Sequence, residues 1–512
     1  MSVPTEQQQA IYDYVRAKRK HIAVRALAGS GKTTTAVAAA KCVSNEKNVG
    51  FVAFNKHIAA ELQSRLGLSA RAATLHSVGF STLRSKIPGV GEVDGKKYFK
   101  ILKELYPQAF DHRDKLHKSF SGINKLIDIF RNELASFEGD EAPVRKQIIK
   151  ACDLQGWEFP PHMSSFDEML SMVRNIVKIG LEQMQTVDYT DMVSAPSYLG
   201  LVAHQYDFLI ADEAQDFNRA QQQLVMGLSP RIMFVGDPHQ SIMLFAGADA
   251  RSFNTLRREL NATEFPLSTC WRCPASHLDL ARHLVPDIQN RPNAPRGEYE
   301  ETVEAALPRM VLPGDLVICR SNAPLVSLTY QLISNNVPAT IRGRSIGDGL
   351  TGLIKKLFPT SIPDLIRKIA NYRQVNMDKL IERDASDSAI QAHTDQCNCI
   401  GILANSNENV GELMTAIDRM FADDIDESKK VILSSIHRSK GSEANSVYIL
   451  HPHILGRKGK NEESTVQEMN LAYVALTRSK HRLVLAEGAK SKRPETSEWL
   501  KQMWMSRSGQ EG

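Results

Sequence analysis

A glycine-rich segment near the amino terminus places the strongest constraint on how this chain folds. It follows a short apolar run (Ile22, Ala23, Val24) and precedes an alanine-rich run typical of a helix. A strand, a glycine turn and a helix in this order predict a loop whose backbone N–H groups face a phosphate, aided by the helix N-terminus. The residues expected to bind the phosphates are Ala28, Gly29, Ser30, Gly31, Lys32, Thr33 and Thr34.

Within this loop, Lys32 is expected to reach the β- and γ-phosphates, and the Thr33 hydroxyl to help bind Mg²⁺. The strict motif begins with glycine, whereas this chain has Ala26 at that position. The alternative is a glycine-rich turn between strand and helix that binds nothing.

A second motif favours the nucleotide site. The apolar run Phe208–Ala211 ends in the adjacent carboxylates Asp212 and Glu213. Asp212 is expected to bind Mg²⁺, and Glu213 to polarise the water that attacks the γ-phosphate. Two solvated acids at a strand end are the alternative, but this is less probable beside a phosphate loop in the same chain. The two motifs together predict a nucleoside triphosphatase.

Composition sets wider bounds. The chain has 512 residues, enough for several domains, with 42% apolar and 24% charged residues, as in soluble globular proteins. The net charge of +5 permits a polyanionic partner without requiring one. Seven cysteines without a secretory leader indicate reduced thiols, and no apolar run is long enough to span a membrane. We expect an intracellular enzyme, cytoplasmic and nucleoid-associated in a prokaryote or phage, nuclear in a eukaryote.

Apolar strand patterns alternate with helical ones in two parts of the chain, and long amphipathic helical patterns interrupt both. The prediction is an α/β protein with two lobes, each a parallel sheet flanked by helices and each carrying a mainly helical insertion. The predicted domains are a first lobe (1–83 and 206–265), its insertion (84–205), a second lobe (266–344 and 430–490), its shorter insertion (345–429) and a tail (491–512).

Further motifs follow one another in order from Thr5 to about Leu485. They include Gly236-Asp237-Pro238-His239-Gln240, Thr269-Cys270-Trp271-Arg272, Ser435-Ile436-His437-Arg438 and Ala475-Leu476-Thr477-Arg478. The ordered series resembles the UvrD/Rep/PcrA group of superfamily 1A DNA helicases, in particular the compact F-box-helicase-like and phage-type members. The resemblance implies two RecA-like lobes, ATP and Mg²⁺ as cofactors, and single-stranded or partly duplex DNA as partner.

The resemblance also implies roles at the nucleotide. Gln7 would read the adenine edge, Gln240 would contact the γ-phosphate, and Glu443 lies in a motif that touches nucleotide and DNA. Arg272 and Arg478 would act as arginine fingers, and Trp271 would stack on adenine. The alternatives are ordinary ones: a polar helix cap around Thr5 and Gln8, surface arginines and a tryptophan packed in the core.

The resemblance also implies contacts with DNA. The expected residues are Phe54, Asn55, Lys56, Thr74, His76, Phe245 and His437. Two departures from the pattern affect this assignment: Phe54 lies one position nearer to the Asn-Lys pair than the usual aromatic, and Met243, Phe245 and Ala246 stand where the relatives have tyrosine, tryptophan and arginine. In a later motif Ser442 replaces a leucine, which affects the local packing. Phe245 retains the ability to stack on a base.

The predicted activity is ATP-driven movement along single-stranded DNA with separation of duplexes, in replication, repair or recombination; a 3′-to-5′ direction is implied by the resemblance alone. One alternative is a translocase that displaces bound proteins with little unwinding. Another is an ATPase subunit that works with a partner such as a nuclease, in repair, recombination or defence. A helicase specific for RNA is less favoured.

Overall fold

A computed structural model gives the fold of the chain. It divides into two compact units, Met1–Leu267 and Ser268–Gly512. The residues that the structure describes are 3–18, 20–43, 48–53, 55–67, 70–110, 115–138, 141–155, 157, 159, 163, 165–243, 251–382, 387–421, 427–458 and 462–488.

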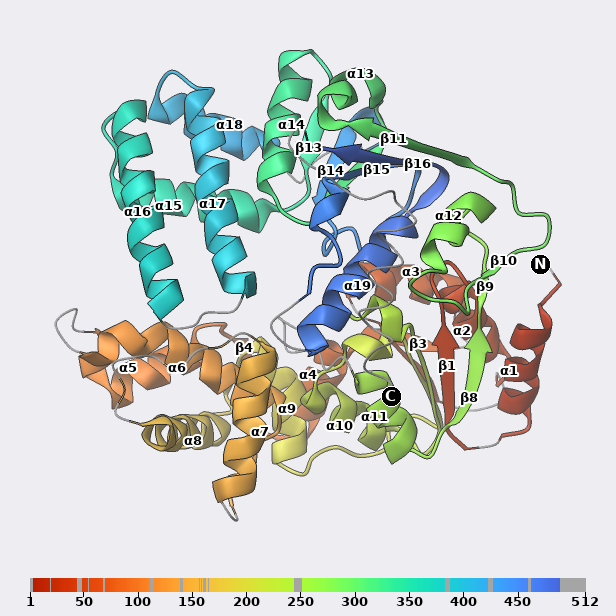
Figure 1. Cartoon of the computed structure of the whole chain (residues 1–512). Coiled ribbons are helices and arrows are strands. Elements are labelled where there is room, and N and C mark those ends of the chain that lie inside the picture. Colours follow the sequence, from red (N-terminus) through yellow and green to blue (C-terminus); the bar gives the residue numbers. More distant parts are fainter. Residues whose placement is uncertain are drawn as a thin grey trace. The chain divides into compact units, whose positions relative to one another are not determined.

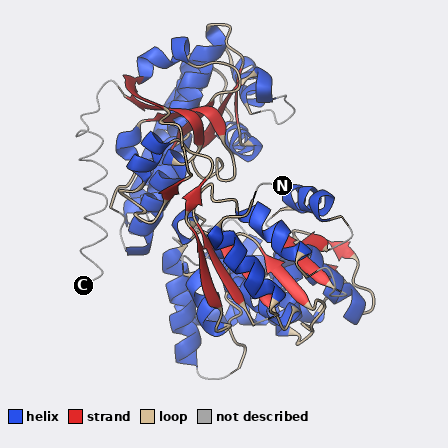
Figure 2. Cartoon of the chain, turned by 90° about the vertical axis from the view of Figure 1, so that its right-hand side faces the viewer, coloured by secondary structure: helices blue, strands red, loops and turns tan. Residues whose placement is uncertain are grey.

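A six-stranded parallel sheet forms the centre of the first unit (Figures 1 and 2). Its strands, in spatial order, are β3 (Arg71–Thr74), β2 (Val49–Ala53), β6 (Phe208–Ala211), β7 (Ile232–Gly236), β1 (Ile22–Ala26) and β8 (Thr263–Leu267). All neighbouring strands are parallel, so their carboxyl ends lie along one edge of the sheet.

Alternate residues of these strands enter two different cores, because successive side chains of a strand point to opposite faces. Val24, Phe51 and Val235 pack on one face, while Ala23 and Phe234 pack on the other. Helices cover both faces: α1 (Glu6–Arg16), α2 (Lys32–Lys41), α3 (Lys56–Leu66), α4 (Leu75–Lys86), α9 (Tyr189–Tyr198), α10 (Arg219–Leu228) and α11 (Ser252–Glu259). A sheet buried on both faces explains its nearly continuous apolar strands.

Between β3 and β6 the chain forms a helical layer with an apolar core of its own. Its helices are α5 (Lys97–Leu105), α6 (Lys115–Asn132), α7 (Glu141–Leu154) and α8 (Phe166–Glu182), and a short parallel pair joins β4 (Glu92–Val93) to β5 (Thr186–Val187). Ile123, Phe130 and Val173 are among the fully buried members of this core.

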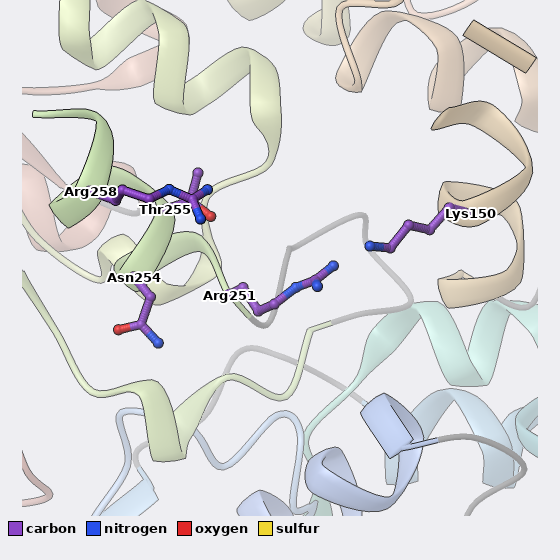
Figure 3. Close-up of a pocket in the computed structure, with 5 residues that line it drawn as sticks. All are labelled: Lys150, Arg251, Asn254, Thr255 and Arg258. Atoms are coloured by element: carbon purple, nitrogen blue, oxygen red, sulfur yellow. The ribbon is translucent and has the colours of Figure 1, made fainter. Parts of the chain in front are cut away.

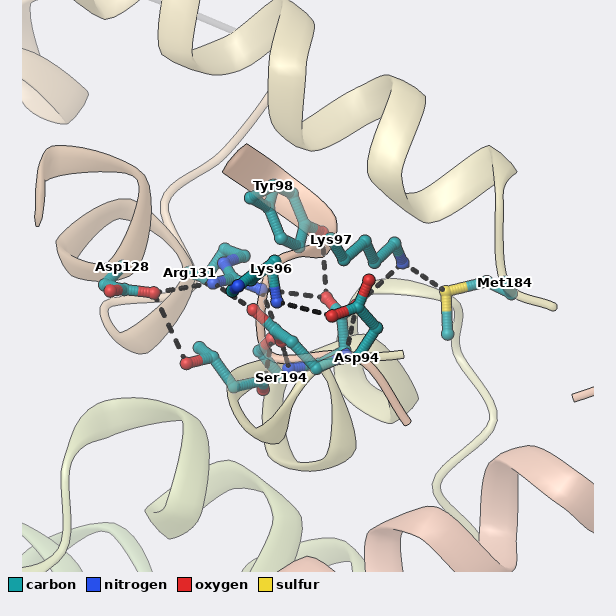
Figure 4. Close-up of polar contacts among 11 residues, drawn as sticks. Asp94, Lys96, Lys97, Tyr98, Asp128, Arg131, Met184 and Ser194 are labelled. Atoms are coloured by element: carbon teal, nitrogen blue, oxygen red, sulfur yellow. Dashed lines mark hydrogen bonds and ion pairs between the residues drawn. The ribbon is translucent and has the colours of Figure 1, made fainter. Parts of the chain in front are cut away.

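A cluster of buried charges connects this helical layer to α9 (Figure 4). Arg131 of α6 donates to both carboxylate oxygens of Asp188, each at 2.8 Å, and to Asp191 at 3.0 Å. Lys97 and Tyr98 of α5 donate to Asp191 at 2.7 and 2.8 Å. The two cations and the two α9 carboxylates balance, and this balance allows the charges to be buried.

The same two acids build the start of α9. Asp188 is the N-cap and accepts from the Asp191 backbone, while Asp191 accepts from the Asp188 backbone, so that they form a capping box. The Arg131 guanidinium also lies 3.7 Å from the centre of the Tyr98 ring. Burial raises the pKa of Asp188, and the adjacent Arg131 opposes that rise.

The second unit contains another six-stranded parallel sheet. Its strands, in spatial order, are β11 (Glu298–Val303), β16 (Ser479–Glu487), β15 (Ala444–Leu450), β12 (Leu316–Cys319), β14 (Val431–Ser435) and β13 (Ala339–Ile341). A separate two-stranded ladder pairs β9 (Thr269–Cys270) with β10 (Gln289–Asn290).

Helices also accompany this second sheet (Figure 1). Among the described residues of the mainly helical stretch expected over 345–429, four α-helices share one apolar core with α14 and one face of the sheet. The helices of the unit are α12 (Ala275–Ala281), α13 (Leu307–Met310), α14 (Ala323–Ser334), α15 (Arg344–Leu357), α16 (Ile362–Glu382), α17 (Asp387–Asn405), α18 (Val410–Met420) and α19 (Glu462–Leu476).

The fold class expected from the sequence is confirmed: two parallel sheets flanked by helices, each sheet interrupted by a helical segment. The boundaries assigned to the five segments stay predictions. In the part of the chain that the structure describes, no helix combines the length and the apolarity that a membrane span requires.

We predict that Gly79→Ala destabilises the first unit. A Cβ on Gly79, in α4, would lie 1.8 Å from the backbone oxygen of Met192 in α9, so the two helices must separate. Overpacking of this kind costs about 1–3 kcal/mol of unfolding free energy. Urea unfolding of the two proteins measures the effect. Gly95→Ala is the control, because its Cβ meets nothing within 4 Å; equal midpoints for wild type and Gly79→Ala would contradict the prediction.

Candidate active site

The glycine-rich loop joins β1 to α2 at the carboxyl edge of the first sheet. Gly29 and Gly31 have φ angles of 67° and 82°, in the left-handed region that side chains disfavour. Gly31 is the N-cap of α2, and Lys32 is its first residue. The sequence thus turns sharply and begins a helix with its first N–H groups at the loop.

The Ser30 hydroxyl is buried in this loop, and among the described residues it has no hydrogen-bond partner. Buried polar atoms without a partner are uncommon in folded proteins, so this one suits a ligand that supplies an acceptor. Of the other residues expected at the phosphates, Ala28 is fully buried, Thr33 is half-buried and Thr34 is exposed. The loop therefore fits a phosphate group.

Two carboxylates lie at the end of β6, which is separated from β1 in the sheet by β7. The Lys32 ammonium is 3.5 Å from the Glu213 carboxylate, so the two motifs found in the sequence meet in the fold. Asp212 is buried, and its carboxylate accepts from the Glu213 backbone N–H at 2.9 Å. Glu213 itself has a φ of 54°, which turns its side chain out of the strand direction.

A buried polar network extends from Glu213 to the end of β7. The Gln215 side chain donates to Glu213 and accepts from the Asp237 backbone N–H at 3.1 Å. Gln240 donates to the Asp237 carboxylate at 2.7 Å. Burial raises the pKa of Asp237, and the positive charge of Lys32 opposes that rise. Gln240, expected at the γ-phosphate, thus belongs to the same network as Lys32 and Glu213.

Gln215 and Asp237 were not among the residues assigned from the sequence. Asp237 directly follows the fully buried strand β7, and Gln215 comes a few residues after the end of β6, as Asp212 and Glu213 do. In a parallel sheet that position is shared by every strand end along one edge. The signal that identifies them is their place in the chain after an apolar run.

The segment before the loop confirms the helix cap considered as the ordinary interpretation. Thr5 and Gln8 form a reciprocal capping box at the start of α1. The Gln8 amide also donates to the Thr35 hydroxyl of α2 at 3.0 Å. Gln7 lies in the first turn of α1 and is half-buried, and its role at adenine stays a prediction.

In the second unit, two expected residues share an ion pair. Arg272 donates to the Glu443 carboxylate at 2.6 Å and to the Thr477 backbone oxygen at 3.2 Å. Lys480 also lies 2.6 Å from Glu443. Burial would raise the pKa of Glu443, but Lys480 and Arg272 lower it below its usual value. Trp271 is 43% exposed, so it does not pack in the core.

Arg478, the other expected arginine finger, lies in the same unit. Its side chain is buried, and its guanidinium donates to the backbone oxygens of Val474 at 2.9 Å and Ser442 at 3.2 Å. It also donates to the Thr477 hydroxyl at 3.3 Å. The structure thus brings Arg272, Glu443 and Arg478 together around Thr477, and the arginine-finger roles stay predictions.

Several residues expected at DNA have local structural roles. Asn55 caps α3 by accepting from the Ile58 N–H at 2.8 Å, and Lys56, the first residue of α3, is exposed. Thr74 caps α4 by accepting from the Ser77 N–H at 3.2 Å. Phe54 and Phe245 lie outside the described residues.

The two expected histidines are both partly buried. Burial lowers the pKa of His76 in the first unit. In the second unit, burial and the neighbouring charge of Arg320 lower the pKa of His437 to about 3, so that its imidazole is neutral at physiological pH. The contact with DNA expected of His437 stays a prediction, and a neutral imidazole would make it a hydrogen bond rather than an ion pair.

Comparison with known proteins agrees with this geometry. The model of the UvrD/REP helicase N-terminal domain matches residues 4–261, and that of the UvrD-like helicase C-terminal domain matches residues 361–488. The chain belongs to the UvrD/Rep helicase family. This confirms the resemblance drawn from the motifs.

Similar curated proteins are DNA helicases of the same family. F-box DNA helicase protein 1 of Schizosaccharomyces pombe is 22% identical, over 94% of this chain and 57% of its own length. ATP-dependent DNA helicase srs2 of the same yeast is 22% identical, over 79% and 48%. ATP-dependent DNA helicase PcrA of Bacillus subtilis is 26% identical, over 52% and 37%. The chain spans about half the length of the curated relatives it matches, or less.

We predict that Lys32→Ala lowers ATP hydrolysis at least about 100-fold, because it removes the cation that follows the glycine-rich loop and lies 3.5 Å from Glu213. The fold should be kept, since Lys32 belongs to neither apolar core of the sheet. Steady-state phosphate release measures the loss. Lys41→Ala, at the far end of α2, is the matched control. Wild-type turnover in Lys32→Ala would overturn the site assignment.

We also predict a pH effect from His437. Its folded pKa lies below the ordinary value, so the unfolded chain binds more protons, and this contribution to stability is lost as pH falls from about 6.5 toward 3. Urea unfolding at pH 7.5 and 5.5 should therefore show a smaller drop for His437→Gln than for wild type. His481→Gln, at an exposed histidine of the same unit, is the control; identical drops in all three proteins would contradict the prediction.

Proposed function

We propose that this protein is an ATP-dependent DNA helicase that moves along single-stranded DNA, in the 3′-to-5′ direction, and separates duplexes in replication, repair or recombination. The observation that carries the proposal is the meeting of the phosphate loop and the strand-end acids, with Lys32 3.5 Å from Glu213 in a helicase-family fold. The relatives named above are DNA helicases, which supports DNA as substrate.

In the proposed reaction, the loop and Lys32 bind the ATP phosphates, while Thr33 and Asp212 hold Mg²⁺, which supplies charge stabilisation of the transferring phosphoryl group. Glu213 accepts a proton from the attacking water. Lys32 and Gln215 keep its carboxylate in place before ATP arrives. Arg272 and Arg478 add positive charge to the phosphoryl group, as arginine fingers do.

The hydrogen-bond network of Glu213, Gln215, Asp237 and Gln240 links the site of the γ-phosphate to other parts of the first unit. Gln240 is bonded to Asp237, and Asp237 is bonded through its backbone to Gln215, the partner of Glu213. A change at any one of these side chains leaves a buried polar group without its partner. Binding and hydrolysis of ATP are therefore coupled to the segment that follows β7.

The test is ATP hydrolysis with and without single-stranded DNA, with duplex DNA and RNA as parallel titrations. Strong stimulation by single-stranded DNA supports the proposal, and strand separation on substrates with a 3′ or a 5′ overhang then tests the direction. Hydrolysis that ignores nucleic acid contradicts the proposal and favours an ATPase subunit that needs a partner.

A second assay separates unwinding from protein displacement. Release of a protein bound to single-stranded DNA, without strand separation, would favour the displacing translocase. Glu213→Gln is the control in both assays: it should bind ATP yet hydrolyse it at least about 100-fold more slowly.

A further inference from the structure

A pair of cysteines in the second unit has no part in the proposed function. Cys270 ends the short strand β9 and Cys273 follows it, so the two form a C-x-x-C sequence around Trp271 and Arg272. Both are free thiols, and both are buried. In the first unit, by contrast, the lysine and arginine side chains that line a pocket (Figure 3) are accounted for by the DNA that a helicase handles. The thiols require a different chemistry.

The two thiols lie in contact with one another. The Cys273 backbone N–H donates to the Cys270 sulfur at 3.4 Å, and the two side chains share a hydrogen bond. The Cys273 sulfur also lies 3.5 Å from the Thr477 backbone oxygen. Because a thiol has one proton, Cys273 donates either to the Cys270 sulfur or to this oxygen. A small movement of Cys273 away from Thr477 therefore brings the two sulfurs to bonding distance.

These contacts make the two thiols unequal. The hydrogen bond from Cys273 lowers the pKa of Cys270 to about 6 against the effect of burial, and the backbone N–H groups of Cys273 and Arg272 add to the lowering. The same hydrogen bond, together with burial, raises the pKa of Cys273 well above its ordinary value. At neutral pH Cys270 is therefore a thiolate, the form that reacts with oxidants, while Cys273 keeps its proton.

The segment that contains the pair has little regular structure. The strand β9 has two residues and pairs with the two-residue β10, and the residues from Trp271 to Cys273 are in neither a helix nor a strand. Trp271, between the cysteines, is 43% exposed. Local opening of such a segment breaks fewer backbone hydrogen bonds than opening of the six-stranded sheet. A molecule as small as hydrogen peroxide therefore reaches the buried sulfurs.

We propose that Cys270 and Cys273 are a reactive dithiol that hydrogen peroxide oxidises to a disulfide, and that this bond withdraws Arg272 from Thr477 and Glu443. The second part rests on the proposed function, in which Arg272 stabilises the transferring phosphoryl group. Arg272 lies between the two cysteines and donates to the same Thr477 oxygen that Cys273 faces. When Cys273 moves to bond Cys270, the peptide that carries Arg272 moves with it, and the 2.6 Å contact with Glu443 is lost.

The oxidation balances in two steps. The Cys270 thiolate attacks one peroxide oxygen; an S–O bond forms, the O–O bond breaks, and the released hydroxide takes a proton from solvent. The Cys273 sulfur then attacks the sulfur of this sulfenic acid; an S–S bond forms, the S–O bond breaks, and the Cys273 proton leaves with the hydroxide as water. The sulfurs are oxidised, and the peroxide is reduced to water. A dithiol reductant reverses the change by thiol–disulfide exchange.

The first test maps the disulfide in the full chain. Wild-type protein is treated with hydrogen peroxide, its free thiols are blocked with iodoacetamide, and it is cut with trypsin without reductant. Trypsin cleaves after Arg272, so only a disulfide keeps the peptides 259–272 and 273–282 together. We expect mass spectrometry to find the joined peptides after oxidation and the separate peptides after dithiothreitol. Separate peptides in the oxidised sample overturn the proposal.

The second test measures ATP hydrolysis in the same samples. Oxidation should lower it at least about tenfold, because an arginine finger contributes more than that to phosphoryl transfer, and dithiothreitol should restore it. Cys273→Ala should match reduced wild type and lose the sensitivity to peroxide, since alanine keeps the small apolar character of a buried thiol. The matched control is Cys397→Ala with Cys399→Ala. These two buried thiols are two positions apart on α17 and do not face each other, so the control should respond to peroxide as wild type does.

The outcomes separate the two parts of the proposal. Joined peptides with unchanged ATP hydrolysis overturn the effect on Arg272. An equal loss of hydrolysis in Cys273→Ala and wild type overturns it as well, as does a control that resists peroxide or a loss that dithiothreitol does not reverse. If reduced wild type does not hydrolyse ATP, the proposed function fails, while the joined peptides still report on the dithiol.

Discussion

The parallel pairing of strands in the first sheet is the constraint on which the candidate site depends. Since all carboxyl ends lie at one edge, residues separated by about two hundred positions in the sequence, Lys32 after β1 and Glu213 after β6, come within 3.5 Å. Asp237 after β7 joins them for the same reason. No local interaction among these side chains needs to bring them together, because the backbone hydrogen bonds of the sheet already do so.

The sequence predicted the buried strands well and the edge strands poorly. The short apolar runs Phe208–Ala211, Leu316–Cys319 and Val431–Ser434 predict strands, and the structure has β6, β12 and β14 there, with only β14 one residue longer. The edge strands β8 and β11 were not among the expected strands, because a strand paired on one side only is partly exposed and contains polar residues. Hydrophobic periodicity is weak at such positions.

At the candidate site, the motifs indicated which side chains to expect at the nucleotide, but not the contacts among them. Lys32 and Glu213 were assigned to one site from two separate motifs, and the structure has them 3.5 Å apart, whereas the burial of Arg478 among backbone oxygens had no sequence signal.

The buried cluster around Arg131 has an evolutionary consequence. Lys97, Arg131, Asp188 and Asp191 balance one another, so replacing any one of them leaves a buried charge unmatched, at a cost of about 3–5 kcal/mol. Replacing all four with apolar residues has no such penalty, yet every single step toward that state does. These positions are therefore epistatic: the cluster can be inherited or lost as a whole, and its charges should vary together among relatives.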